Sequence, residues 1–207
     1  MQDLLHEEKA QFVANLLKDK AGKLLDVGCF KGKLGLYLNP KFEYFGIDID
    51  SKALGAAKEN LPNSKFATCD LNKNNLPFNT KFNFIVALDV LEHTHDPAKV
   101  LSEMKENLAS DGVLLIALPN DYHLLNRLRF LLNRPISPEP FWAYTHLHIF
   151  TMKQAEEFLM QNKLEITGKY YLPGTKPKHL HFLTRMTIAK NFPNIFCRGV
   201  LYICKLK

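Results

Sequence analysis

Apolar runs and amphipathic segments alternate along most of the chain. Residues 3–20 carry apolar side chains at helical spacing, which predicts an amphipathic helix. Short apolar runs predict strands at 23–28, 43–48, 65–69, 82–88 and 113–118. Helical patterns lie between most of them, at 32–38, 51–60 and 97–109. The strands are mainly apolar rather than alternating between apolar and polar residues, which is typical of a parallel sheet covered by helices on both faces.

The second half of the chain is less regular. Asp111 and Gly112 predict a turn before the fifth strand, and residues 119–150 combine prolines with aromatic side chains, which favours an insertion that caps the sheet. A helix at 151–162, strands at 164–172 and 200–205, and a loop at 173–178 are expected to follow. We therefore expect one α/β domain over residues 1–207, with an N-terminal helix at 1–20, a core at 21–118, a cap at 119–150 and a C-terminal part at 151–207.

Composition narrows the class of protein. The 207 residues are 46% hydrophobic and 23% charged, which argues against disorder. The net charge is +6, but the lysines are spread along the chain, so no nucleic-acid partner is expected. No apolar stretch is long enough for a membrane span, and the N-terminal residues do not resemble a signal peptide. The four cysteines form no C-x-x-C pair, which favours a reducing, cytoplasmic location.

Small and acidic residues follow the predicted strands, where open α/β sheets bind their ligands. Gly28 and Gly32 come after the first strand and allow close approach of the backbone to a ligand. Asp48 ends the second strand, where a carboxylate can accept hydrogen bonds from both ribose hydroxyls of an adenosine group. A dinucleotide fingerprint would also need glycine where the chain has Phe30 and Lys33. The pattern therefore favours a nucleoside ligand without a pyrophosphate.

Four blocks resemble, in order and spacing, the class I S-adenosylmethionine-dependent methyltransferases: LLDVGCFKGKLG, GIDID, CDLNKNNLPF and FNFIVALDVLEHTHDPAKVLSEMKENLASDGVLLIALPN. The stretch HLHIFTMKQAEEFLMQNKLEI is similar to the type-11 and type-23 branches, and PNDYHLLNRLRFLLNRPI to the MetW-like branch. The resemblance implies a Rossmann-like fold, with helices on both faces of a seven-stranded, mostly parallel sheet whose last strand is antiparallel.

The resemblance also implies which residues hold S-adenosylmethionine and its product S-adenosylhomocysteine. Asp26 would lie near the methionine amino group, Asp48 would bind the ribose hydroxyls, and Asp70 would accept from the adenine amino group. Phe30, in the same cofactor loop, stands where the family more often has glycine. The other implied cofactor-binding positions are Gly28, Cys29, Gly32, Ile49, Leu71, Ala87 and Leu88.

Histidines provide candidates for removing a proton from a methyl acceptor, because imidazole titrates near neutral pH. His93 follows the fourth strand and His146 lies at the edge of the insertion, so these two are the candidate catalytic residues. Apolar and aromatic groups usually line ligand pockets. The candidates for the acceptor pocket are Tyr122, Trp142, Tyr144 and His148.

H-x-H pairs at 93 and 95, 146 and 148, and 179 and 181 suggest metal ligation, since such a pair on a strand points to one face. The spacing fixes no third ligand, so no metal is expected.

Methyl transfer to an oxygen or nitrogen atom of a small-molecule acceptor, such as a saccharide or quinone-type intermediate, is the expected function. The alternative is a MetW-like regulatory protein that binds S-adenosylmethionine and a partner enzyme. A protein partner or a homodimer is compatible with either. A nicotinamide-dependent oxidoreductase is disfavoured by the missing glycines.

Overall fold

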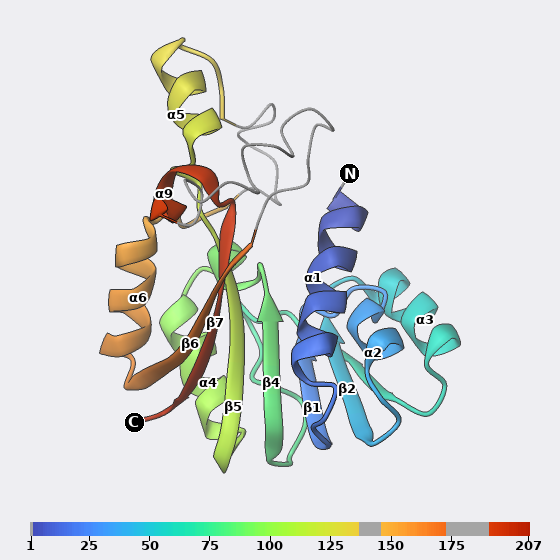
Figure 1. Ribbon diagram of the computed structural model, residues 1–207. Helices are drawn as coiled ribbons and strands as arrows, with labels where there is room; N and C mark the ends of the chain where they lie inside the picture. The colour runs from blue at the N-terminus through green and yellow to red at the C-terminus, as the bar shows by residue number, and fades with distance from the viewer. Residues whose placement is uncertain (1, 137–145, 173–190) are drawn as a thin grey trace.

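The computed structural model describes residues 2–136, 146–172 and 191–207. Its described strands form one seven-stranded sheet in the order β3-β2-β1-β4-β5-β7-β6 (Figure 1). Strands β1 to β5 are parallel, whereas β7 is antiparallel to both β5 and β6. This confirms the expected fold class, including the antiparallel last strand. The strands are β1 (Gly22–Val27), β2 (Phe42–Asp48), β3 (Lys65–Thr68), β4 (Phe82–Leu88), β5 (Leu108–Pro119), β6 (Leu164–Leu172) and β7 (Gly199–Leu206).

Helices cover both faces of the sheet (Figure 1). On one face, Val13 of α1 and Leu34 of α2 pack in one apolar cluster with the strands. On the other, Leu101 of α4 and Leu159 of α6 pack in a second cluster. Because both faces are buried, the central strands carry apolar residues at most positions. The helices are α1 (Gln2–Leu16), α2 (Lys33–Tyr37), α3 (Ser51–Asn60), the 3-10 helix η1 (Leu91–His93), α4 (Pro97–Glu106), α5 (Leu124–Leu131), α6 (Met152–Gln161) and α9 (Pro193–Phe196).

Local signals place the starts of three helices. The Asp50 side chain accepts from the amides of residues 52 and 53 and so caps α3. Asp96 caps α4, whose first turn contains Pro97. Thr151 and Gln154 form a reciprocal capping box at the start of α6. The sequence therefore determines where these elements begin.

The ends of elements depart from the expectations. Helix α1 ends at Leu16 rather than at residue 20, because the chain turns there and the amide of Lys20 bonds to the carbonyl of Leu17. Helix α4 ends at Glu106, and the expected turn at 111–112 is wrong, since β5 already begins at Leu108. The pairing of β4 with β5 shifts register at this point, so the glycine signal marks an irregularity within the strand. Within the expected cap, α5 was not predicted; it lies beyond the carboxyl ends of the parallel strands (Figure 1).

Candidate active site

The loop after β1 turns sharply at the carboxyl end of the sheet. Gly28 and Gly32 have φ angles of 74° and 70°, in the left-handed region that favours glycine. The amides of Gly28 and Cys29 donate to the carbonyl oxygen of Ile47 at 2.8 and 2.9 Å, which ties the loop to β2. A Cβ atom at Gly28 would lie 2.6 Å from Cγ2 of Val90. A side chain at this position would therefore be both strained and crowded.

Phe30 takes a glycine-like conformation without being glycine. Its φ is 47°, and its side chain is 37% exposed. The left-handed region costs an L-residue about 1–2 kcal/mol, so the loop holds Phe30 in a strained conformation. The loop thus turns at position 30 with a phenylalanine in a conformation that favours glycine.

Asp48 joins the loops that follow β1 and β2. Its Oδ2 accepts from the amide of Phe30 at 2.8 Å, and its Oδ1 accepts from the amide of Asp50 at 2.9 Å. Each carboxylate oxygen offers about two acceptor sites, so these bonds leave capacity for further donors. Ile49, next in sequence, is 56% exposed and presents an apolar side chain beside this carboxylate.

Asp26 and Cys29 lie beneath the loop. The Asp26 carboxylate is buried and accepts from the Tyr44 hydroxyl at 2.5 Å. Burial raises the pKa of Asp26 to about 7, the Tyr44 hydrogen bond opposes this rise, and the charge of Asp48 adds to it. The Cys29 thiol is buried too, and its sulfur would lie 2.7 Å from a Cβ at Gly46. Cys29 can therefore offer a ligand its backbone rather than its thiol.

Asp70 lies after β3, where an adenine-binding acceptor is expected. Its carboxylate accepts from the Asn72 amide at 3.0 Å and pairs with Lys73 at 3.0 Å. The hydrogen bond from Lys73, followed by that from Asn72, lowers the pKa of Asp70, so this group is a stable acceptor at neutral pH. Leu71 beside it is half-buried and packs against the core. The amide of Cys69 donates to the Asp48 carbonyl oxygen at 2.9 Å. This bond holds the loop after β3 beside the loop after β2.

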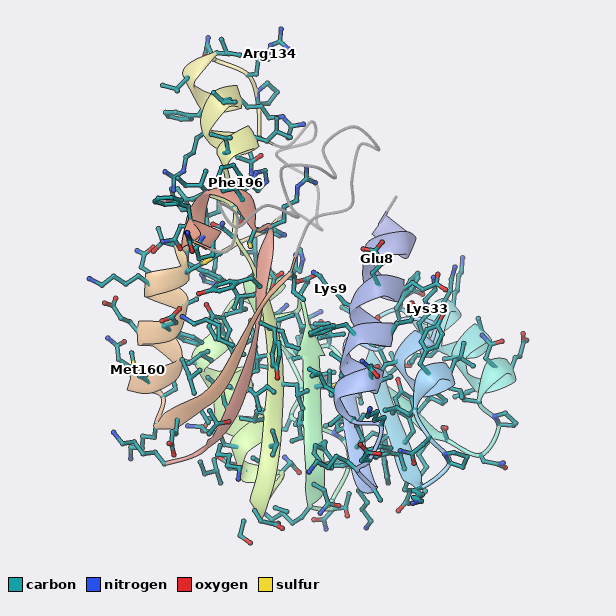
Figure 2. The ribbon with its side chains drawn as sticks, in the orientation of Figure 1. Glu8, Lys9, Lys33, Arg134, Met160 and Phe196 are labelled. Carbon is teal, nitrogen blue, oxygen red and sulfur yellow. The ribbon has the colours of Figure 1, made fainter. Side chains whose placement is uncertain are left out.

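Helix α1 reaches the end of β4. Ala87 is buried, Leu88 is half-buried, and Asp89 follows with a φ of 55°. Lys9 of α1 forms an ion pair with Asp89, and Figure 2 shows Lys9 on the side of α1 that faces β4. Lys33, also labelled there, pairs with Glu7 at 3.3 Å and so links α1 to α2. No pattern in the sequence singles out Lys9, because its spacing within an amphipathic helix gives no sign of what it faces.

A polar cluster extends the site beyond β4. The rings of His93 and His146 meet edge to face with centroids 5.0 Å apart. His146 Nδ1 is 2.9 Å from Asp121 Oδ2, and this pair joins the chain after β5 to the far edge of the insertion. Glu92, beside His93, is fully buried. Burial, followed by the charge of Asp89, holds the pKa of Glu92 well above its usual range.

The two histidines that meet come from different H-x-H pairs. The sequence pairs suggested 93 with 95 and 146 with 148, whereas the fold brings His93 to His146. His148 Nε2 instead lies 2.8 Å from the Thr94 carbonyl oxygen. Sequence analysis also missed Glu92 and Asp121; a charged residue within the apolar run ALDVLEH was the available signal for Glu92.

The expected acceptor pocket is only partly described. Tyr122 is exposed, and its carbonyl oxygen accepts from Arg127 Nε at 2.5 Å. His148 borders an apolar cavity of about 200 Å³ between η1, α4 and α6. Trp142, Tyr144, the loop at 173–178 and the histidines at 179 and 181 lie outside the described residues.

The loops after β1, β2 and β3 offer acceptors and backbone suited to an adenosine group. Asp48 provides a carboxylate with acceptor capacity beside the exposed side chain of Ile49, and Asp70 provides a second carboxylate across the β2–β3 edge. The backbone turn at Gly28 approaches Val90 so closely that a Cβ is excluded. These features provide polar contacts for a ribose and an adenine.

Comparisons with known proteins agree with this geometry. The family profile described as "Methyltransferase domain" matches residues 1–167. No curated protein sequence matches the chain. Within the described part of the chain, no helix has the length and apolar character needed to cross a membrane.

Three solved structures illustrate the similarity of fold. Magnesium protoporphyrin IX methyltransferase from Synechocystis, solved with S-adenosylhomocysteine, has 16% identity and a TM-score of 0.68, over 99% of this chain and 84% of that one. A TehB-like S-adenosylmethionine-dependent methyltransferase from Corynebacterium glutamicum has 16% identity and a TM-score of 0.63, and the match covers 96% of this chain and 87% of that one. A methyltransferase from Haloferax volcanii, solved in complex with a protein activator, has 14% identity and a TM-score of 0.69, and the match covers 100% of this chain and 92% of that one. The chain therefore belongs to the methyltransferase-domain family, and its fold is that of the class I, S-adenosylmethionine-dependent methyltransferases.

Proposed function

We propose that the protein transfers the methyl group to an oxygen or nitrogen atom of a small molecule, with saccharide and quinone-type intermediates as the first classes to test. The observation that carries the proposal is the position of the His93 and His146 rings, 5.0 Å apart, just beyond β4. The carboxyl end of this strand adjoins the loop that is tied to Asp48. The proposal thus places a cofactor side and an acceptor side at one edge of the sheet.

On the cofactor side, the residues of the chain bind S-adenosylmethionine and orient it. When bound, S-adenosylmethionine supplies an electrophilic methyl group on a positively charged sulfur. In the proposal, Asp48 accepts from the ribose hydroxyls, Asp70 accepts from the adenine amino group, and Ile49 covers one face of the adenine. Residues 87 and 88 line the methionine end with their backbone. Holding donor and acceptor in line can contribute about 7–11 kcal/mol to lowering the barrier.

On the acceptor side, His146 is the first candidate for a base and His93 the second. The Asp121 carboxylate accepts the Nδ1 proton of His146, which leaves the Nε2 lone pair to take a proton from the acceptor. Tyr122 and His148 remain candidates for acceptor contacts, since both lie near this cluster in sequence and one borders the apolar cavity. Trp142 and Tyr144 stay predictions.

The proposal also includes a cytoplasmic location, and a protein partner or homodimer. All four cysteines are free and buried, as expected in a reducing compartment. The Haloferax relative is complexed with a protein activator, which makes a protein partner worth testing.

Isothermal titration with S-adenosylmethionine and S-adenosylhomocysteine, with NAD as the control, is the first test. Micromolar binding of the first two and none of NAD is expected. Labelled-methyl transfer is then screened against hydroxyl- and amine-bearing small molecules, with RNA and protein pools for comparison. Transfer to RNA or protein alone would contradict the proposal, and binding without any turnover, together with a co-purifying enzyme, would favour the regulatory alternative.

A further inference from the structure

Three side chains next to the proposed acceptor site converge on one point. Glu92, His93 and His146 each place one potential ligand atom within 4.8 Å of the other two. The first two residues belong to η1, and the third lies more than fifty residues later in the chain. The backbone holds these segments together, because the amides of Leu147 and His148 donate to the Glu92 carbonyl oxygen at 2.8 and 3.2 Å.

The carboxylate of Glu92 is the unusual member of this cluster. Its exposed fraction is 0%, and within the described parts of the chain neither of its oxygens has a hydrogen-bond partner. Asp89 Oδ1 is likewise buried without a hydrogen-bond partner there, although Asp89 Oδ2 pairs with Lys9. Burying a carboxylate without compensation costs several kcal/mol, so buried charges are usually paired or coordinate a metal. Glu92 therefore needs a counterpart, either a proton or a cation.

His146 is oriented as metal-binding histidines usually are. Such a histidine generally donates its second ring N–H to a carboxylate or a carbonyl, which fixes the tautomer and the ring orientation. The contact of His146 Nδ1 with Asp121 Oδ2 at 2.9 Å is of this kind, and it leaves Nε2 as the ligand atom. The edge-to-face contact of His93 with His146 brings the second imidazole to the same place.

We propose that Glu92, His93 and His146 bind a divalent transition-metal cation such as Zn²⁺, Mn²⁺ or Co²⁺. Two imidazole nitrogens and one carboxylate oxygen suit these ions, whereas Mg²⁺ and Ca²⁺ prefer oxygen ligands alone. Ligand atoms bound at about 2.0–2.2 Å lie roughly 3–3.5 Å from one another, so binding would draw the side chains together by about 1 Å. Three protein ligands leave coordination positions open, which is typical of catalytic rather than structural sites.

The position of the site suggests its use, and this step rests on the proposed function. A cation at the end of β4 would attract the oxygen of an acceptor hydroxyl and lower the pKa of that hydroxyl. With the Nε2 lone pair of His146 on the cation, the proton would leave to water instead of to this histidine, and the oxygen lone pair would form the new bond to the methyl carbon. The carbon–sulfur bond would break with its electron pair remaining on sulfur, which gives the methyl ether and S-adenosylhomocysteine. The site therefore favours an oxygen acceptor over a nitrogen acceptor.

Metal titration of the chelator-treated protein tests the site without any need for turnover. Zn²⁺ binding is measured by calorimetry, and Co²⁺ binding by its visible absorption, which reports the coordination of the ion. We expect one equivalent to bind with a micromolar or lower Kd, and Glu92→Gln and His146→Ala each to weaken binding by at least tenfold. His95→Ala is the matched control, since His95 belongs to an H-x-H pair but is exposed and outside the cluster; its Kd should stay within about twofold.

The outcomes separate the two proposals. Absence of binding, or equal binding in all variants, would overturn the metal site and leave a proton as the counterpart of Glu92. If Glu92→Gln fails to fold by circular dichroism, His93→Ala and His146→Ala decide the matter. Metal binding that depends on the cluster, in a protein that methylates no small molecule, would instead keep the site and overturn the proposed function.

Discussion

The cofactor side and the acceptor side of the site are built in different ways. On the cofactor side, Gly28, Asp48 and Asp70 each lie within two residues of the last residue of a strand, and hydrogen bonds to the backbone tie their loops together. On the acceptor side, Glu92 of η1 and Asp121 after β5 meet the segment of His146 from across the insertion, through side chains and through backbone hydrogen bonds to the Glu92 carbonyl oxygen. The cofactor side follows from the register of the sheet. The acceptor side depends on how the chain between Asp121 and His146 comes back to the end of β4.

This difference predicts that the two sides can be disabled separately. His146→Ala should lower kcat by about 10²–10⁴-fold, because the change removes either a base or a metal ligand. The affinity for S-adenosylmethionine should change by less than about threefold. Steady-state kinetics and calorimetry on the same preparation measure both, with His95→Ala as the control. A loss of cofactor affinity in His146→Ala would show that the two sides are not separate.

The opposite change should disable the cofactor side. Asp48→Ala should weaken S-adenosylmethionine binding about 100-fold or more, because it removes charged acceptors for the ribose and also the bond that holds the Phe30 amide. Calorimetry measures the Kd. Asp50→Ala is the matched control, since it removes only the cap of α3, at about 1 kcal/mol of stability. Equal affinities in the two variants would remove Asp48 from the cofactor site.

The buried carboxyl beneath the cofactor loop should make stability depend on pH. The pKa of Asp26 is about 7 in the folded protein and near 3.8 in the unfolded chain, so the folded state holds its proton more tightly. This contribution to stability is fully present below pH 4 and is lost as the pH rises towards 7. Between pH 4.5 and 7, the free energy of unfolding should therefore fall less in Asp26→Asn than in the unsubstituted protein. The difference between the two falls should be on the order of 2–4 kcal/mol. Urea denaturation at the two pH values measures this, and parallel curves for both proteins would contradict it.

The smallest effect is expected at Phe30. Phe30→Gly should raise the free energy of unfolding by about 0.5–1 kcal/mol, because glycine takes the left-handed conformation without steric strain while losing more conformational entropy on folding. Phe30→Ala is the control, since alanine keeps the Cβ and hence the strain. The midpoints of urea denaturation rank the three proteins. If Phe30→Gly is the least stable of them, packing of the aromatic ring outweighs the backbone strain.

Much of the core could be predicted because its signals are local. Apolar runs specify buried parallel strands, and Asp50 and Thr151 specify helix starts through hydrogen bonds to amides two or three residues away. The cofactor loops follow, since strands in a parallel sheet end at one edge. Helix ends and the extent of β5 were mispredicted, because the packing of the chain around Leu17 and the register of β4 with β5 decide them.

The sequence by itself determined the order of the core strands and of the helices between them, the loops suited to a nucleoside, and the family to which the chain belongs. Only the tertiary structure decided that His93 meets His146 rather than acting with His95, and that Glu92 lies fully buried beside them. It also decided that Lys9 pairs with Asp89. The physical reason is distance along the chain: contacts between residues fifty or more positions apart leave no periodicity in the sequence, and they exist only once the sheet has brought its strand ends together.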